Sequence, residues 1–254
     1  MTRAWFRFYA ELNRFLAPSQ RQCGFEWLCS QDASVKHMVE ALGVPHTEVA
    51  LILVNGQPVD FSYRLREQDR VSVYPYFSCL KADAQPPVSL QPPGPPCFIA
   101  DAHLGRLARD LRMLGFDVLY RNDFSDADIV SIAVQEQRIV LTRDRDLLMR
   151  KPVARGCYLH AIASDSQLLE VMARYRLAER IMPLSRCLKC NGLLEPVSRQ
   201  AVAGDLPEHS GACQQHFRRC SGCGKVYWEG AHVTRMRKRI AALLAAMRPA
   251  IPAP

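Results

Sequence analysis

Two cysteine pairs in the last third of the chain have the spacing of a metal site. Cys187-Leu-Lys-Cys190 and Cys220-Ser-Gly-Cys223 are Cys-x-x-Cys motifs with 29 residues between them. Four thiolates in this pattern are typical of a closed tetrahedral zinc site, which is structural because no coordination position is left open. Disulfide bonds are disfavoured in an intracellular protein. We therefore predict that these four cysteines bind zinc.

Acidic residues recur where strands are expected to end. Asp101 follows a short apolar run, Asp128 follows the next expected strand, and Asp144 and Asp146 follow a third in the sequence Leu-Thr-Arg-Asp-Arg-Asp. The carboxyl ends of parallel strands share one edge of a sheet, so these carboxylates are expected to converge. Converging carboxylates repel one another unless a divalent cation lies among them, and oxygen ligands suit magnesium or manganese. Such a site supports hydrolysis of a phosphodiester.

Asp101 also has a second interpretation, as a helix cap. Asp is a favoured N-cap residue, and Leu104 and Leu107 begin an apolar helical pattern that ends at Gly115, a suitable C′ residue. The two roles are compatible, because one carboxylate oxygen can cap a helix while the other faces an ion.

Residues 97–183 alternate between strand and helix patterns. We expect strands at 97–100, 116–121, 138–142 and 157–161, and helices at 103–114, 126–136, 144–149 and 166–175. Strands separated by helices pair in parallel through right-handed crossovers. The expected fold is an α/β domain with a small parallel sheet, covered by helices on both faces.

Residues 1–80 predict a separate α+β module. Strand patterns at 3–10 and 26–29 precede a helix that Ser34 is expected to cap, and further strands follow. The dipeptide Asn55-Gly56 between two extended runs is a strong hairpin signal.

Residues 81–96 are expected to link the two parts of the chain. Six of the 14 residues from 83 to 96 are proline, and the segment has no periodicity. This composition predicts a semi-rigid spacer, and we place the domain boundary there.

The net charge of +8 is concentrated in residues 184–254, which hold 11 basic and 4 acidic side chains. A concentrated basic segment is typical of a polyanion partner, and a solvated basic face is the alternative. Tyr227 and Trp228 add surfaces on which bases can stack. We predict RNA contacts for seven side chains: Arg143, Arg145, Lys225, Arg235, Arg237, Lys238 and Arg239.

Three arginines form a stripe on the helix expected after Asp101. Arg106, Arg109 and Arg112 lie across from its apolar face. Both a solvated, salt-bridged face and contact with an RNA backbone account for this pattern.

Several motifs occur in the order found in a known nuclease family. They are Phe98-Ile-Ala-Asp-Ala-His-Leu-Gly-Arg-Leu-Ala-Arg, Asp128-Ile-Val-Ser-Ile-Ala133 and Arg138-Ile-Val-Leu-Thr-Arg-Asp-Arg-Asp-Leu147. Residues from about 97 to 230 resemble the Mut-seven C-terminal RNase family, a PIN-like nuclease group with a zinc ribbon. The resemblance implies a catalytic magnesium or manganese ion held by Asp101, Asp128 and Asp144, with Asp146 in support. We expect Asp165 to supply a fourth acid.

The N-terminal module resembles the ubiquitin-like β-grasp proteins, particularly the small sulfur carriers. Val54-Asn-Gly and Asp69-Arg-Val-Ser-Val-Tyr-Pro carry this resemblance. The carriers act through a free C-terminal Gly-Gly, whereas this chain continues through Phe77-Ser-Cys-Leu80. We therefore expect a structural or docking role, with a protein partner.

These observations predict a divalent-metal-dependent ribonuclease that positions RNA through a basic zinc ribbon at 184–254. The alternative is a non-catalytic RNA-binding or adaptor protein that retains a PIN-like fold. The N-terminus lacks the apolar segment of a signal peptide, and no run is long enough to span a bilayer. We expect a cytoplasmic protein without a membrane partner.

Overall fold

The computed structural model describes four stretches of the chain: residues 1–76, 94–205, 216–228 and 230–247. Most of the expected proline-rich linker, together with Phe77 to Leu80, lies outside the described residues. Within the described stretches, no helix combines the length and the apolar character that crossing a membrane requires.

Contacts divide the chain into two compact units, each built from segments that are distant in sequence. Unit 1 contains Met1–Gly94 and Asp126–His160, and unit 2 contains Pro95–Ser125 and Ala161–Pro254. The α/β segment therefore contributes to both units, and each unit is described by itself below.

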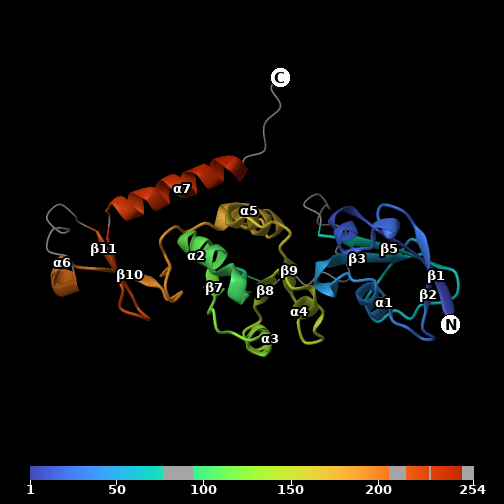
Figure 1. Ribbon diagram of the computed structural model, residues 1–254. Coiled ribbons are helices and arrows are strands. Elements are labelled where there is room, and N and C mark those ends of the chain that lie inside the picture. Colours follow the sequence, from blue (N-terminus) through green and yellow to red (C-terminus); the bar gives the residue numbers. More distant parts are fainter. Residues whose placement is uncertain (77–93, 206–215, 229, 248–254) are drawn as a thin grey trace, which may run out of the picture. The chain divides into compact units, whose positions relative to one another are not determined.

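Five strands in unit 1 form the sheet of the N-terminal module (Figure 1). They are β1 (Thr2–Phe8), β2 (Phe25–Cys29), β3 (Val49–Val54), β4 (Gln57–Val59) and β5 (Asp69–Pro75), in the order β2-β1-β5-β3-β4. β1 and β5 pair in parallel, and the other neighbours are antiparallel. Helix α1 (Val35–Ala41) buries Val35 and Val39 in the same core as Phe6 and Val73. This strand order and single helix confirm a β-grasp-like module.

Short 3-10 helices complete the N-terminal module: η1 (Ala10–Phe15), η2 (Pro18–Gln20) and η3 (His46–Glu48). Ser34 caps α1 as expected, because its hydroxyl accepts a hydrogen bond from the amide of His37 at 3.2 Å. Asn55 and Gly56 have φ values of 52° and 82°, the left-handed conformation that a tight hairpin turn requires.

The α/β segment contains two parallel strand pairs. In unit 2, β6 (Cys97–Ala100) pairs with β7 (Asp117–Leu119), and in unit 1, β8 (Ile139–Thr142) pairs with β9 (Gly156–Tyr158). Within the α/β segment, unit 2 contains the helices η4 (Ala102–Leu104), α2 (Gly105–Met113), α5 (Ser164–Arg174) and η5 (Leu177–Arg180), and unit 1 contains α3 (Asp126–Gln135) and α4 (Arg145–Met149). Every strand and helix expected here is present, with ends shifted by a few residues.

Gly115 ends α2 in a conformation and a space that suit only glycine. Its φ is +97°, and a Cβ there would lie 2.2 Å from the carbonyl oxygen of Met182. The close approach brings residue 182 alongside the end of α2, where the amide of Met182 donates to the carbonyl of Leu114 at 2.9 Å.

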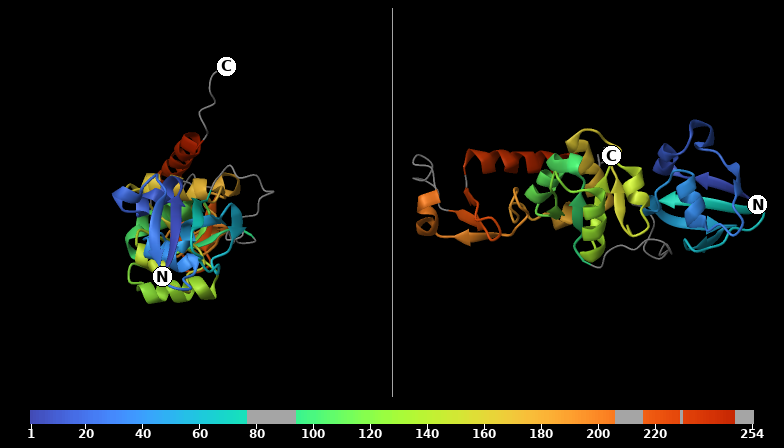
Figure 2. Two further views of the ribbon diagram at one scale, coloured as in Figure 1. Left: turned by 90° about the vertical axis from the view of Figure 1, so that its right-hand side faces the viewer. Right: turned by 60° about the horizontal axis from the view of Figure 1, so that its bottom comes forward.

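The C-terminal part of unit 2 contains an antiparallel sheet that we call the cysteine ribbon. Its strands are β10 (Leu194–Val197), β11 (Phe217–Cys220) and β12 (Val226–Trp228), and α6 (Arg199–Val202) and η6 (Ala203–Asp205) follow β10. The long helix α7 (Ala231–Met247) leaves the ribbon and contacts α5 (Figure 2). Its residues Val233, Met236 and Ile240 are buried.

The N-terminal module packs against residues 153–160 within unit 1. The Nε2 atom of His46 lies 2.7 Å from the carbonyl oxygen of Val153. The carboxylate of Glu48 accepts a hydrogen bond from the amide of Tyr158 at 2.7 Å, and the Phe15 ring meets the Tyr158 ring edge-on at 5.1 Å. The module therefore shares a folded unit with part of the α/β segment.

Candidate metal centre and acidic loops

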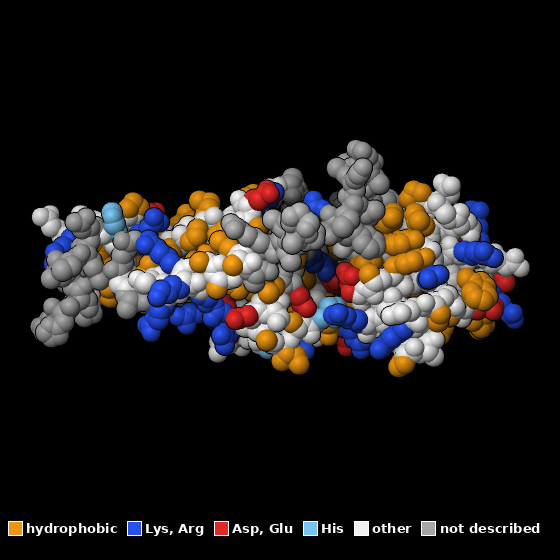
Figure 3. All heavy atoms as spheres, turned by 90° about the horizontal axis from the view of Figure 1, so that it is seen from above, with side chains coloured by type: hydrophobic (Ala, Val, Ile, Leu, Met, Phe, Trp, Pro, Cys, Tyr) orange, Lys and Arg blue, Asp and Glu red, His pale blue; other side chains and the backbone are white. Residues whose placement is uncertain are grey.

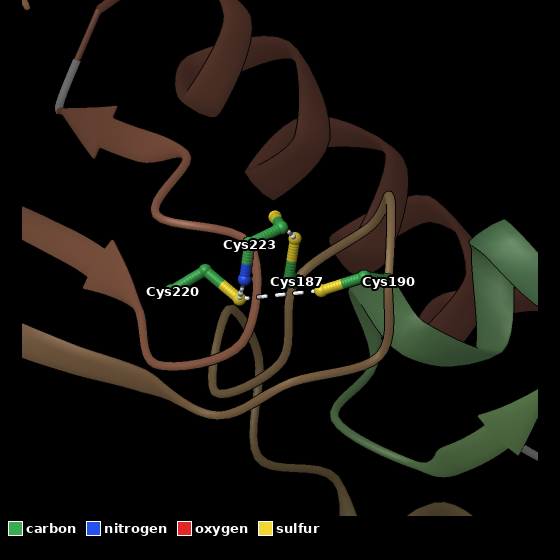
Figure 4. A group of neighbouring side chains, drawn as sticks. All are labelled: Cys187, Cys190, Cys220 and Cys223. Atoms are coloured by element: carbon green, nitrogen blue, oxygen red, sulfur yellow. Dashed lines mark hydrogen bonds between the residues drawn. The ribbon is translucent and has the colours of Figure 1, made fainter.

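The four predicted zinc cysteines lie together in the cysteine ribbon (Figure 4). All four sulfur atoms lie within 4.8 Å of one another. The Sγ atoms of Cys187 and Cys223 are 3.6 Å apart, and those of Cys190 and Cys220 are 3.3 Å apart. Zn–S bonds of about 2.3 Å in a tetrahedron place sulfurs about 3.8 Å apart, so the cluster fits a zinc ion.

The two Cys-x-x-Cys loops have the same backbone hydrogen bonds. In the first, the amide of Asn191 donates to the carbonyl of Cys187 at 3.0 Å, and the amide of Cys187 donates to the carbonyl of Gly192 at 2.8 Å. In the second, Gly224 donates to Cys220 at 3.0 Å, and Cys220 donates to Lys225 at 3.0 Å. Asn191 and Gly224 both have positive φ, at 72° and 71°. The cluster is thus built from two equivalent halves.

The thiols of the cluster have opposing pKa shifts. Burial raises the pKa of Cys187, but hydrogen bonds from the Tyr227 hydroxyl and from the amides of Cys190 and Lys189 outweigh it and lower the value to about 6. Burial raises the pKa of Cys190 to about 12. One thiolate therefore forms readily while the other keeps its proton, which binding of a metal ion would release.

Tyr227 supports the cluster from β12, a role that the sequence did not reveal. Its hydroxyl lies 3.2 Å from the Sγ of Cys187 and accepts a hydrogen bond from the amide of Leu188 at 3.0 Å. Burial raises the pKa of Tyr227, so this hydroxyl keeps its proton. Groups that hydrogen-bond to metal ligands orient them and tune their basicity.

The first cysteine loop is fixed to the end of α2 and to β7. The buried guanidinium of Arg112 donates to the carbonyls of Val118, Leu188 and Lys189 at 2.8 to 3.3 Å. The Asn191 side chain accepts from the amide of Val118 at 3.0 Å. Arg112 therefore belongs neither to a solvated face nor to an RNA contact. The Arg112 side chain is buried by contact with Leu188, which lies 76 positions away in the sequence. The helical pattern of the sequence alone could not indicate this contact.

Asp101 caps the helix that follows β6. Its Oδ1 accepts a hydrogen bond from the amide of Ala102 at 2.6 Å, and its Oδ2 lies 3.3 Å from Nδ1 of His103. The side chain is 13% exposed. The capping role is thus present, and Asp101 belongs to unit 2.

Asp128, Asp144 and Asp146 belong to unit 1. Asp128 is exposed in the first turn of α3. Thr142 Oγ1 accepts from the amide of Asp144 at 2.9 Å, and the carboxylate of Asp144 accepts from the amide of Asp146 at 2.8 Å, capping α4. The loop after β8 is therefore ordered by its own hydroxyl and carboxylate. Shared binding of an ion by these acids and Asp101 stays a prediction.

The predicted RNA-binding residues divide into exposed and ion-paired side chains. The exposed ones are Arg145, Lys225, Arg235, Arg237 and Lys238, and Arg143 is half-buried. Arg239 donates to Asp110 at 2.8 Å and also pairs with Asp165, so it joins α7 to α2 and α5. Asp165, expected as a fourth acid, forms this ion pair.

The fold and the cysteine cluster define a class of protein that joins a β-grasp-like module to an α/β segment and a four-cysteine ribbon. A family model described as Mut7-C RNAse domain matches residues 96–240, and one described as Mut7-C ubiquitin matches residues 1–81. The first match covers more than half of the chain, so the chain belongs to the Mut7-C RNAse domain family. The two matches lie on either side of the proline-rich segment.

Among solved structures, the crystal structure of H. volcanii small archaeal modifier protein 1 matches at 16% identity with a TM-score of 0.25. The match covers 30% of this chain and 98% of that chain. No curated protein matches.

Proposed function

We propose that this protein is a cytoplasmic ribonuclease with a PIN-like catalytic segment. The observation that carries the proposal is the match of an RNAse-domain family model to residues 96–240, the range that contains Asp101, Asp128, Asp144 and Asp146. The four cysteines hold a structural zinc ion, and the acids hold a catalytic magnesium or manganese ion.

The acids have the chemistry that this role requires. When bound, a divalent ion of this kind lowers the pKa of water and offsets the charge on the leaving oxygen. Asp101 and Asp144 each follow a parallel strand, and a backbone hydrogen bond to one carboxylate oxygen orients each side chain. Arg143 precedes Asp144 in the loop after β8 and Arg145 begins α4, so both cations flank this acid and would donate to phosphate.

A labelled single-stranded RNA incubated with magnesium or manganese tests the activity. We expect metal-dependent cleavage by the zinc-loaded protein and its loss in Asp101→Asn, Asp128→Asn and Asp144→Asn. Asp126→Asn is the matched control, because Asp126 is in the same turn of α3 as Asp128 and pairs with Arg150 at 2.9 Å. Cleavage that survives Asp101→Asn combined with Asp144→Asn would contradict the proposal.

A second function, RNA binding without cleavage, is favoured by the exposed cations of unit 2. Lys225, Arg235 and Lys238 are exposed in the ribbon and on α7. RNA binding through them does not require the acids. A wild-type protein that binds RNA but shows no cleavage with either metal would support this second function.

A further inference from the structure

Two neighbouring cavities in unit 2 are lined by basic side chains. One, of about 540 Å³, is lined by Arg109, Lys189, Lys225 and Trp228, and the other, of about 460 Å³, by Arg106, Arg109 and Arg235 among others. The two share Arg109 and Leu188. We call the combined surface, defined by Arg106, Arg109, Lys189, Lys225, Arg235 and Trp228, the basic groove. Figure 3 shows Lys and Arg side chains gathered in the part of the molecule that holds α7.

Among the described residues, the charged side chains that line the groove are almost all cationic. Its five cations are exposed, and Asp110 is the one carboxylate among the described residues that line either cavity. Asp110 already pairs with Arg239. Within the described stretches, no carboxylate lies within 4.0 Å of the cationic groups of Arg109, Lys189 or Lys225. An uncompensated field of this kind attracts a polyanion.

The cysteine loops fix the backbone of two of these cationic residues. Lys189 lies between Cys187 and Cys190, and its carbonyl accepts from Arg112 at 3.0 Å, three residues along α2 from Arg109. Lys225 follows the second loop, and its carbonyl accepts from the amide of Cys220 at 3.0 Å. Zinc binding would therefore preform the groove, which reduces the entropy lost when a ligand binds.

The aromatic lining favours a single strand over a duplex. Trp228 is half-buried, and Tyr227, whose ring is 5.5 Å from the Lys225 ammonium group, lines the first cavity beside it. Duplex RNA keeps its bases stacked on each other, whereas a single strand offers unpaired bases to an aromatic ring.

We propose that the basic groove binds single-stranded RNA, with phosphates at its five cations and an unpaired base stacked on Trp228. The choice of RNA as the polyanion rests on the proposed ribonuclease function. The substrate RNA would thus be bound jointly by residues of α2, the cysteine ribbon and α7.

Fluorescence anisotropy with a labelled oligouridylate tests this proposal on the full, zinc-loaded chain. Asp101→Asn and Asp144→Asn form the background, so that cleavage does not interfere. Arg109→Ala with Lys225→Ala is expected to lower affinity roughly tenfold and to reduce the slope of log K against log salt by about 1.4, the value for two phosphate contacts on a single strand. The matched control, Lys151→Ala with Arg199→Ala, removes two exposed cations that line neither cavity.

Equal losses of RNA affinity in the groove variant and in the control variant would overturn the proposal, because affinity would then depend only on the total charge of the protein. Arg109→Lys with Lys225→Arg keeps the charge and should retain affinity, which separates lost contacts from misfolding. Trp228→Ala should weaken binding roughly fivefold or more, whereas Trp228→Phe should retain most of it. Stronger competition by a duplex, or by polyglutamate at equal charge, would also overturn it.

The groove and the nuclease activity can fail separately. Groove-dependent binding without metal-dependent cleavage by the wild type would support the groove and contradict the nuclease. Cleavage whose KM is unchanged by Arg109→Ala with Lys225→Ala would support the nuclease and contradict the groove.

Discussion

Tyr227 links the metal cluster to the RNA-binding surface that we propose. Its hydroxyl contacts Cys187 and the amide of Leu188, while its ring lies beside Lys225. A single side chain thus stabilises a thiolate on one side and an aromatic, basic cavity on the other. Loss of the hydroxyl should affect zinc binding more than RNA binding, because the hydroxyl contacts Cys187 and the loop that holds it.

Tyr227→Phe is expected to weaken zinc binding about tenfold, the lower end of what loss of a supporting hydrogen bond costs a metal site. The Tyr227 hydroxyl lowers the pKa of Cys187, so its removal raises that pKa. Protons then compete with zinc at higher pH, and the midpoint of zinc release shifts upward. A chromophoric chelator measures the shift across a pH series.

Tyr63→Phe is the control for this experiment, because the Tyr63 hydroxyl bonds to Asp69 within the N-terminal module of unit 1. Unchanged zinc release in Tyr227→Phe would contradict a role for the hydroxyl.

The cysteine cluster itself predicts a defined metal content. The purified protein should contain about one zinc ion per chain, and Cys190→Ser should lose it, since three thiolates leave the tetrahedral shell incomplete. Cys23→Ser removes an exposed thiol outside the cluster and should keep the metal. Elemental analysis after gel filtration gives the content, and retention of zinc by Cys190→Ser would argue against the four-cysteine site.

Among elements, α7 is held to α2 and α5 by an ion-pair cluster in addition to its buried apolar residues. Arg239 pairs with Asp110 of α2 and Asp165 of α5, and the Asp110 side chain is 9% exposed. Burial raises the pKa of Asp110, whereas Arg239 and Ser164 lower it without cancelling the effect. The folded protein therefore holds this proton to a higher pH than the unfolded chain does.

Arg239→Ala should raise the pKa of Asp110 further, because the main cation that opposes burial is lost. The protonated carboxyl contributes to the free energy of unfolding below the ordinary Asp pKa of about 4, and this contribution is lost as pH rises through the pKa of the folded state. In the variant, the pKa of the folded state is higher, so the contribution should be lost over a wider pH range. Carbon-13 NMR of the Asp110 carboxyl measures the titration directly. Lys238→Ala, an exposed neighbour on α7, should leave it unchanged.

The elements themselves were largely predictable, because their signals are local. The Ser34 cap, the Asn55-Gly56 turn and the strand and helix patterns from residue 97 onward each depend on residues a few positions apart. The contacts that assemble them were not predictable. Arg112 is buried against backbone carbonyls beyond position 187, and Arg239 pairs with Asp110. Tertiary packing determines which arginines are buried, and the helical periodicity of the sequence does not contain this information.

In the candidate site, too, the features with a local sequence signal were predictable and those that depend on tertiary contacts were not. Two Cys-x-x-Cys motifs specify their chemistry through spacing alone, and the structure brings all four cysteines together. Asp101, Asp128 and Asp144 come from three separate parts of the sequence and occur in both units, so their spacing indicates only that each lies next to the start of a helix.

At the scale of the whole molecule, the N-terminal module is part of a shared fold. Glu48, 2% exposed, accepts from the amide of Tyr158, and His46 contacts the carbonyl of Val153. These contacts tie the β-grasp-like module to residues that the RNAse-domain model covers. They support a structural role for the module, and a protein partner for it stays a prediction.

Glu48→Ala should lower the free energy of unfolding by about 1 to 3 kcal/mol, because the Tyr158 amide loses its acceptor in a largely buried contact. Urea unfolding measures the change. Glu179→Ala, at an exposed position of η5, should change stability by less than about 0.5 kcal/mol. Equal effects of the two substitutions would mean that the contact contributes nothing.

The division of each unit into two chain segments has a consequence for synthesis on the ribosome. Residues 95–125 of unit 2 emerge before residues 126–160, which complete unit 1, and their remaining partners, from 161 onward, emerge last. Domains generally fold as units while the chain lengthens. A chain halted at His160 lacks α5 and Tyr175, which contact α2 and the Phe98 ring in the finished protein, so it leaves apolar surface there uncovered. Such a nascent chain is expected to be a client of ribosome-associated chaperones.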